Sequence, residues 1–271
     1  MPQPRPSNAA QVASPAFRVA ALDADFLAGD STRGVRLQLE YEKTEEILRA
    51  FGVVSTVVVF GSSRARERGE PRAVRWYAEA RDFGRLASIE GGAARPRDGI
   101  YRNVIATGGG PGIMEAANRG AREAGAPTIG FNITLPREQA PNPYTTPELT
   151  FQFHYFAMRK LHFAMRAKAL VVFPGGFGTL DELFELLTLV QTRKLTKKIF
   201  IILYGSEYWN ELINFKAMVK HGMIAETDLN LFQFADDPES ALEMLKESLA
   251  VYVKPDEPGV PAIATSVKPT R

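Results

Sequence analysis

The amino-acid sequence predicts an α/β protein with a doubly wound, mainly parallel sheet and helices on both faces. Short apolar segments alternate with longer amphipathic segments along the 271 residues, as strands and helices do in such folds. The short segments are continuously apolar, as strands buried on both faces must be. Glycine-rich turns follow three of them, at the strand ends where these sheets bind ligands.

The alternating elements predict a single domain over residues 31–253. An amphipathic helix over 35–51 comes first and is expected to pack outside the core. The expected strands cover 56–60, 103–107, 126–131, 169–173 and 199–203. The expected helices after them cover 72–89, 113–124, 156–167, 180–192 and 208–220. Segments 231–235 and 238–251 close the series, and the proline-rich residues 132–148 are expected to form a loop over the ligand site.

The two ends of the chain differ from this core in composition. Residues 1–30 are rich in Pro and Ala with weak periodicity, which predicts a loosely ordered arm. Residues 254–271 carry four prolines and are expected to form a disordered tail. The N-terminus lacks the apolar segment of a secretory signal, and no apolar run approaches the roughly 20 residues that span a bilayer. We therefore expect a cytoplasmic protein with no membrane partner.

The overall composition excludes several classes of function. A formal net charge of +2, spread evenly along the chain, does not favour a nucleic-acid binder. The absence of cysteine excludes disulfides and cysteine–zinc sites. His154 and His162 have no third ligand spaced near them, so we predict no metal site, and no cofactor is indicated.

The three glycine turns are the first candidates for a ligand site. Each turn alone is explained by a tight connection between a strand and a helix, but three at one edge of a sheet favour a binding site. None of them matches the P-loop pattern or the G-x-G-x-x-G dinucleotide fingerprint. The candidate binding residues in these turns are Gly61, Ser62, Gly108, Gly109, Gly110, Gly175, Gly176 and Gly178.

The third turn, residues 174–179, joins a strand to the start of a helix that carries two carboxylates, Asp181 and Glu182. Free N–H groups at a helix start bind anions such as phosphate. The spacing of Thr179 and Glu182 is also that of a capping box, with Thr179 as the N-cap, and Asp181 fits an ordinary first-turn acid. The functional alternative is that Glu182 faces the ligand. A helix N-terminus favours its ionised form, which suits a base or a stabiliser of positive charge.

The segment 151–162 combines aromatic residues with a basic pair, Arg159 and Lys160. One interpretation is a core helix with both cations on its solvent face. The other places Arg159 at the ligand, because its planar guanidinium suits phosphate.

Three motifs, over residues 108–117, 158–160 and 174–182, resemble the "Lonely guy" (LOG) family. These proteins are cytokinin riboside 5′-monophosphate phosphoribohydrolases once described as lysine decarboxylases. The resemblance covers residues 55–250, and the family pattern P-G-G-x-G-T-x-x-E is met in full. It implies a Rossmann-like fold and an active site near a dimer interface.

By motif position, the resemblance assigns the catalytic pair to Arg159 and Glu182. It assigns phosphate binding to the turn that ends at Thr179, and Met114 and Lys160 lie within the shared motifs as further candidates for substrate binding. The implied activity is hydrolysis of the N-glycosidic bond of an adenine-type nucleoside 5′-monophosphate, giving free base and ribose 5-phosphate. The implied assembly is a homodimer or a larger homo-oligomer.

The chain departs from the short plant-like members of that family in three places. It has the additional N-terminal helix and arm, an insertion at 90–102, and Met114-Glu115 where short members have Met-Gly. It therefore resembles a longer bacterial branch, and both cytokinin activation and AMP hydrolysis stay open. The alternative function is a non-catalytic carrier of a nucleotide or molybdenum-cofactor-type ligand on the same fold. A pyridoxal-phosphate decarboxylase is the least favoured, because nothing marks a Schiff-base lysine.

Overall fold

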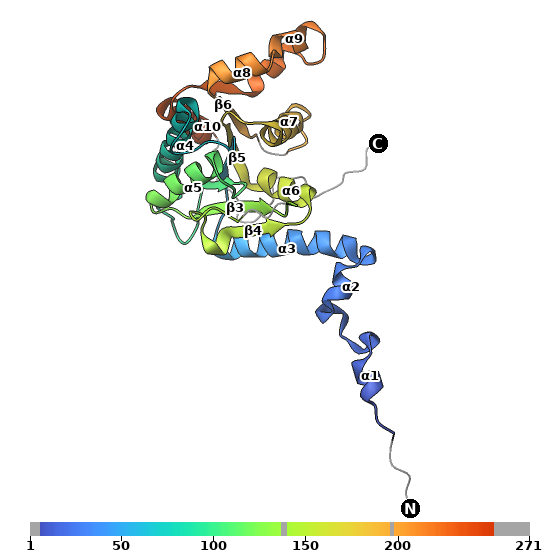
Figure 1. Cartoon of the computed structure of the whole chain (residues 1–271). Coiled ribbons are helices and arrows are strands. Elements are labelled where there is room, and N and C mark those ends of the chain that lie inside the picture. Colours follow the sequence, from blue (N-terminus) through green and yellow to red (C-terminus); the bar gives the residue numbers. More distant parts are fainter. Residues whose placement is uncertain (1–5, 137–139, 196–197, 252–271) are drawn as a thin grey trace, which may run out of the picture. The chain divides into compact units, whose positions relative to one another are not determined.

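A computed structural model describes residues 6–136, 140–195 and 198–251 (Figure 1). These residues contain a seven-stranded sheet in the order β4-β3-β2-β1-β5-β6-β7, and every neighbouring pair is parallel. The predicted α/β class is confirmed. The strands are β1 (Thr56–Phe60), β2 (Val104–Thr107), β3 (Thr128–Ile133), β4 (Thr150–Phe153), β5 (Ala167–Val172), β6 (Phe200–Tyr204) and β7 (Gln233–Ala235).

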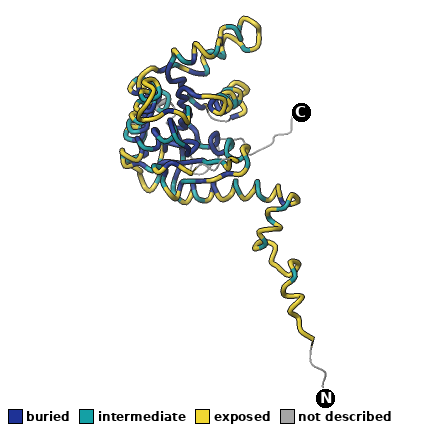
Figure 2. Tube along the Cα trace, in the orientation of Figure 1, coloured by how far each residue is buried: buried dark blue, intermediate teal, exposed yellow. Residues whose placement is uncertain are grey.

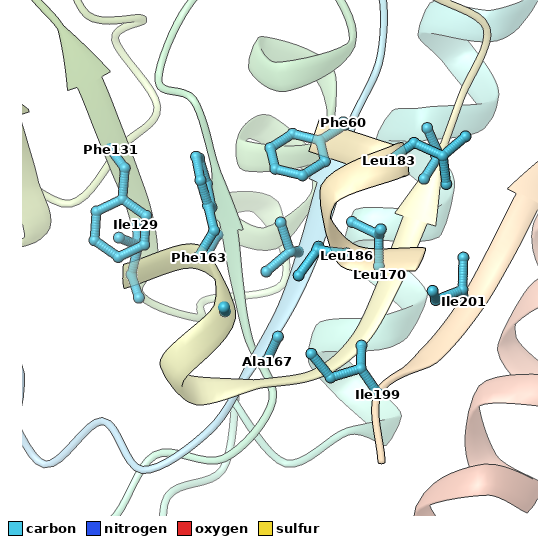
Figure 3. Close-up of a cluster of buried hydrophobic side chains, with 14 of the residues drawn as sticks. Phe60, Ile129, Phe131, Phe163, Ala167, Leu170, Leu183, Leu186, Ile199 and Ile201 are labelled. Carbon is cyan, nitrogen blue, oxygen red and sulfur yellow. The ribbon is translucent and has the colours of Figure 1, made fainter. Parts of the chain in front are cut away.

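Helices cover both faces of this sheet. The main ones are α3 (Arg33–Phe51), α4 (Pro71–Glu90), α5 (Ile113–Glu123), α6 (Phe156–Arg166), α7 (Phe177–Gln191), α8 (Ser206–Leu212), α9 (Phe215–Lys220) and α10 (Pro238–Val251). Side chains along β1 alternate between two buried clusters: Val57 and Val59 pack with α4, α5 and α10, whereas Val58 and Phe60 pack with α3, α6 and α7. Figure 2 shows the buried strands, and Figure 3 shows part of the second cluster.

The order of the strands fixes where a ligand can bind. From β1 the chain adds β2, β3 and β4 on one side, and then returns to place β5 on the other side of β1. The connections after β1 and β5 therefore diverge, and a crevice opens at the carboxyl ends of these two strands.

Two details of the fold differ from the sequence predictions. Strand β4 was not predicted, because it is a four-residue edge strand in which only Phe151 and Phe153 are buried. The helix predicted over 208–220 is two helices, α8 and α9, interrupted at Ile213 and Asn214. The Asn214 side chain accepts a hydrogen bond of 2.9 Å from the Ala217 N–H and so begins a new helix.

The N-terminal residues fold locally into short elements. They include α1 (Ala9–Ala13) and α2 (Ala24–Ala28), and Phe17 and Leu22 are largely exposed. By its contacts, the chain divides into a unit ending at Lys43 and a unit beginning at Thr44. The predicted tail over 254–271 lies outside the described residues, and the domain limits stay predictions. Among the helices that the structure describes, none combines the length and apolarity needed to cross a bilayer.

Helices α4 and α5 meet backbone to backbone at two glycines. A Cβ atom at Gly120 would lie 2.7 Å from the Arg85 nitrogen and closer still to the Arg81 carbonyl oxygen. A Cβ at Gly84 would likewise collide with the Ala117 carbonyl. Glycine is therefore required at both positions by close packing.

We expect Gly120→Ala to destabilise the fold by about 1–3 kcal/mol or more, because backbone atoms must move to admit the methyl group. Gly178→Ala is the matched control: that position is also helical, and a Cβ there meets nothing within 4 Å. Urea unfolding measures both variants. Equal stability of the two would contradict the packing argument.

Candidate functional site

A cavity of about 700 Å³ lies at the carboxyl ends of β1 and β5. The turns after these strands and the first two turns of α7 form most of its wall, α4, α5 and α6 each contribute one residue, and α8 contributes two. Of the predicted site residues, the cavity lining includes Gly61, Ser62, Met114, Arg159, Gly175, Gly176, Gly178, Thr179 and Glu182.

The turn after β5 runs directly into α7. Gly176 is the N-cap, and its carbonyl accepts the first helical hydrogen bonds, from Thr179 at 2.9 Å and Leu180 at 3.0 Å. The N–H groups that precede these bonds have no acceptor within the helix and are suited to an anion. Thr179 packs closely against Gly175 of this turn. A Cβ atom added at Gly175 would lie 2.7 Å from the Cβ atom of Thr179.

The predicted capping box is therefore wrong. Helix α7 begins at Phe177, so Thr179 is inside the helix and is not its N-cap. Asp181 and Glu182 consequently lie beyond the first turn, and Glu182 has no capping role. The side chain of Glu182 is free to serve the cavity that it lines.

Glu182 is a buried carboxylate with one close cation. Its side chain is 7% exposed, and its Oε1 lies 3.8 Å from Nη1 of Arg159. Burial raises the pKa of Glu182 to about 7, against the opposing charges of Arg159 and Lys160. The expectation that the helix start keeps this group firmly ionised is thus wrong, because desolvation outweighs the favourable charges.

Arg159 is held by contacts on three sides. Its Nε donates a 2.7 Å hydrogen bond to the Phe131 carbonyl of β3, and its Cζ lies 5.2 Å from the centre of the Phe163 ring. A Cβ at Gly108 would press into the guanidinium and lie 2.8 Å from the Met114 sulfur. With 13% of its side chain exposed, Arg159 does not lie on a solvent face.

Lys160 is not among the residues that line the cavity. Its Nζ pairs with Asp181 at 2.9 Å and with Glu185 at 2.7 Å, so it ties α6 to α7. The structure does not bring this candidate binding residue to the lining of the cavity, nor does it bring Gly108, Gly109 or Gly110.

The second glycine turn, after β2, contacts Arg159 and Asn142 and does not line the cavity. The side chain of Asn142 donates to the Gly110 carbonyl at 3.1 Å, and the Asn142 N–H donates to the Gly109 carbonyl at 2.8 Å. Gly108 leaves room for Arg159. The described part of the 132–148 loop therefore packs on this turn. Among the described residues no cluster of three or more His, Asp or Glu side chains could hold a metal ion.

Sequence reasoning missed several cavity residues. Ser63 and Arg64 directly follow the first predicted turn and could have been included with it. Tyr208 lies in the first turn of α8, which follows the carboxyl end of β6 at the same edge of the sheet, and this position is a usable signal. Trp76 lies inside α4, and nothing in the sequence marks it.

Comparison with known proteins now adds to the geometry. The family model described as "Possible lysine decarboxylase" matches residues 114–245. A rice protein (Oryza sativa subsp. japonica), named as a probable cytokinin riboside 5′-monophosphate phosphoribohydrolase LOG4, is 27% identical over 210 residues. These are 77% of this chain and 84% of the rice protein. The chain is similar to the LOG proteins. The resemblance found in the sequence is thus confirmed.

Two solved structures are similar to parts of this chain. An X-ray structure of a protein named TM1055 superposes with a TM-score of 0.50 at 22% identity, over 71% of this chain and 99% of that one. The molybdenum cofactor binding protein from Rippkaea orientalis gives a TM-score of 0.47 at 19% identity, over 72% of this chain and 97% of that one.

The raised pKa of Glu182 is directly measurable. In protein labelled with ¹³C at glutamate carboxyl carbons, we expect one signal to titrate near pH 7 and to be absent from Glu182→Gln. Lys160→Met should move the midpoint to higher pH, because the Lys160 charge lowers the Glu182 pKa. A midpoint at the ordinary value of 4.5 would contradict the burial argument.

Proposed function

We propose that this protein hydrolyses the N-glycosidic bond of an adenine-type nucleoside 5′-monophosphate to free base and ribose 5-phosphate. The observation that carries the proposal is a buried Arg159–Glu182 pair in the same cavity as an anion-binding helix start. The names of the LOG relatives support this reaction class.

The two halves of the cavity match the two ends of such a substrate. The N–H groups at the start of α7 suit the 5′-phosphate. Glu182 lies six residues beyond Gly176, about 9 Å along a helix axis. This separation supports a sugar bound beside Glu182 when its phosphate lies at the helix start.

The chemistry requires a negative group beside the sugar. As the bond between C1′ and the base nitrogen breaks, its electron pair leaves with the base and positive charge develops on the ribose. Ionised Glu182 stabilises that charge in a site largely closed to water. A water oxygen then bonds to C1′, and Glu182 is placed to accept the proton that this water loses. The departing base nitrogen takes up one proton in turn, so that neutral base is released.

The alternative is a carrier that binds a nucleotide-like cofactor without turnover. A carrier needs the phosphate-binding amides but gains nothing from a carboxylate at the sugar. Burying Glu182 and Arg159 without using their charges would only reduce stability. The pair therefore favours an enzyme.

A lysine decarboxylase is disfavoured for a different reason. Pyridoxal-phosphate chemistry needs a lysine that can form a Schiff base with the cofactor. Lys160 is engaged by two carboxylates, Asp181 and Glu185, and does not line the cavity.

Three finer points stay predictions. The preference between AMP and a cytokinin nucleotide is one, and the cytoplasmic location is another. The third is assembly into a homodimer or larger homo-oligomer. In support of assembly, Phe177 is 92% exposed and Phe184 is also exposed, both on α7 beside the site.

Removing the carboxylate should abolish turnover but not binding. For Glu182→Gln we expect base release from a panel of nucleoside monophosphates to fall by at least about 100-fold, with nucleotide affinity retained. Asp181→Asn is the matched control: the neighbouring acid is 56% exposed and pairs with Lys160, so activity should stay within a few-fold. Full activity of Glu182→Gln would refute the assigned role. Binding of AMP by the wild type without any base release would favour the carrier.

The rate should also depend on pH through Glu182. Because only the ionised carboxylate stabilises a cation, kcat/KM should fall as pH drops below the Glu182 pKa of about 7. The decrease approaches tenfold per pH unit. Asp181→Asn should show the same decrease of kcat/KM at low pH. A kcat/KM independent of pH between 5 and 7 would argue against an ionised Glu182.

A further inference from the structure

Three consecutive carbonyl groups in the turn after β5, those of residues 174–176, each accept a hydrogen bond. The Pro174 carbonyl accepts from the Ser62 N–H at 2.9 Å, which joins the turns after β5 and β1. The Gly175 carbonyl accepts from the hydroxyl of Tyr208 at 2.7 Å. The Gly176 carbonyl accepts from the first turn of α7. Of these donors, only the Tyr208 hydroxyl comes from a side chain.

The orientation of one carbonyl determines the orientation of the next N–H group. A trans peptide is planar, so the Gly175 C=O and the Gly176 N–H point in opposite directions. Both flanking residues are glycines, whose backbone rotates readily. Without a partner, this peptide could turn its carbonyl toward a bound anion, where its partial negative charge would repel phosphate.

Tyr208 is itself held firmly. It lies in the first turn of α8, directly after β6, where Gly205 adopts a φ of +85°. Its ring packs edge-on against Trp76 of α4, with ring centres 6.0 Å apart, and against Trp209 at 5.2 Å. Burial raises the pKa of Tyr208, so its hydroxyl stays protonated and able to donate.

We infer that Tyr208 is a positioning residue for the substrate phosphate: by fixing the Gly175 carbonyl, it aims the Gly176 N–H at the anion. The inference rests on the proposed function only in placing a phosphate at this turn. It extends the site to α8, outside the motifs that resemble the LOG family. Tyr208 would act on binding of the phosphate end and not on the chemistry at Glu182.

Calorimetric binding of ribose 5-phosphate and of adenosine, which lacks the phosphate, tests the inference without requiring turnover. For Tyr208→Phe we expect a loss of about 3- to 10-fold in ribose 5-phosphate affinity, the usual value of one hydrogen bond, with adenosine affinity unchanged. Tyr204→Phe is the matched control: it removes another buried tyrosine hydroxyl, which lies beside Glu79 at the end of β6. Both affinities should stay unchanged in that variant.

A second measurement uses the wild type, so that it does not depend on folding of a variant. In ¹⁵N-glycine-labelled protein, inorganic phosphate should shift the Gly176 amide signal. An unmoved Gly176 signal, wild-type ribose 5-phosphate affinity in Tyr208→Phe, or an equal loss for both ligands would each overturn the inference. If the selective loss is found but no nucleotide is cleaved, the proposed function fails and the inference stands.

Discussion

The site depends on burying two opposite charges side by side. A buried carboxylate or guanidinium alone is strongly unfavourable, so Glu182 and Arg159 each make the other tolerable. The compensation is uneven. Arg159 also has the Phe131 carbonyl and the face of Phe163, whereas Glu182 has its cation 3.8 Å away, beyond hydrogen-bond distance. The pKa of Glu182 near 7 follows from this deficit.

A second buried glutamate shows the opposite outcome. The side chain of Glu45 of α3 is 3% exposed and contacts two residues of α6. Both Nη atoms of Arg166 donate to its carboxylate, with 3.0 Å between Nη2 and Oε2, and His162 Nδ1 lies 3.4 Å from its Oε1. Burial opposes its ionisation, but the hydrogen bonds outweigh burial and lower the pKa of Glu45 to about 2. The pKa values of these two buried carboxylates thus differ because more hydrogen-bond donors contact Glu45 than Glu182. Glu45 anchors α6 as a fixed charge, and Glu182 faces the same helix as a titratable one.

The sequence predicted the parallel sheet because its strands are apolar on both faces, and that pattern needs no tertiary information. The sequence-based prediction was wrong where one sequence pattern is compatible with two local structures. The spacing of Thr179 and Glu182 fits both a capping box and a helix interior. The glycine-rich sequence around Phe177 gave no sign that the helix begins at that residue. Lys160 follows Arg159 in the sequence, yet the two pair with different acids of α7, Asp181 and Glu182, and only the fold decides which.

The three glycine turns, predicted to share one task, have different ones. The turn after β5 lines the cavity and leads directly into α7, and the turn after β1 also lines the cavity. The turn after β2 underlies Arg159: a methyl group at Gly108 would occupy the space of the guanidinium. Displacing Arg159 would leave Glu182 buried without its nearest cation, and its ionised form would become still less favourable. The ionisation of Glu182 therefore depends on the absence of a side chain at Gly108, directly after β2.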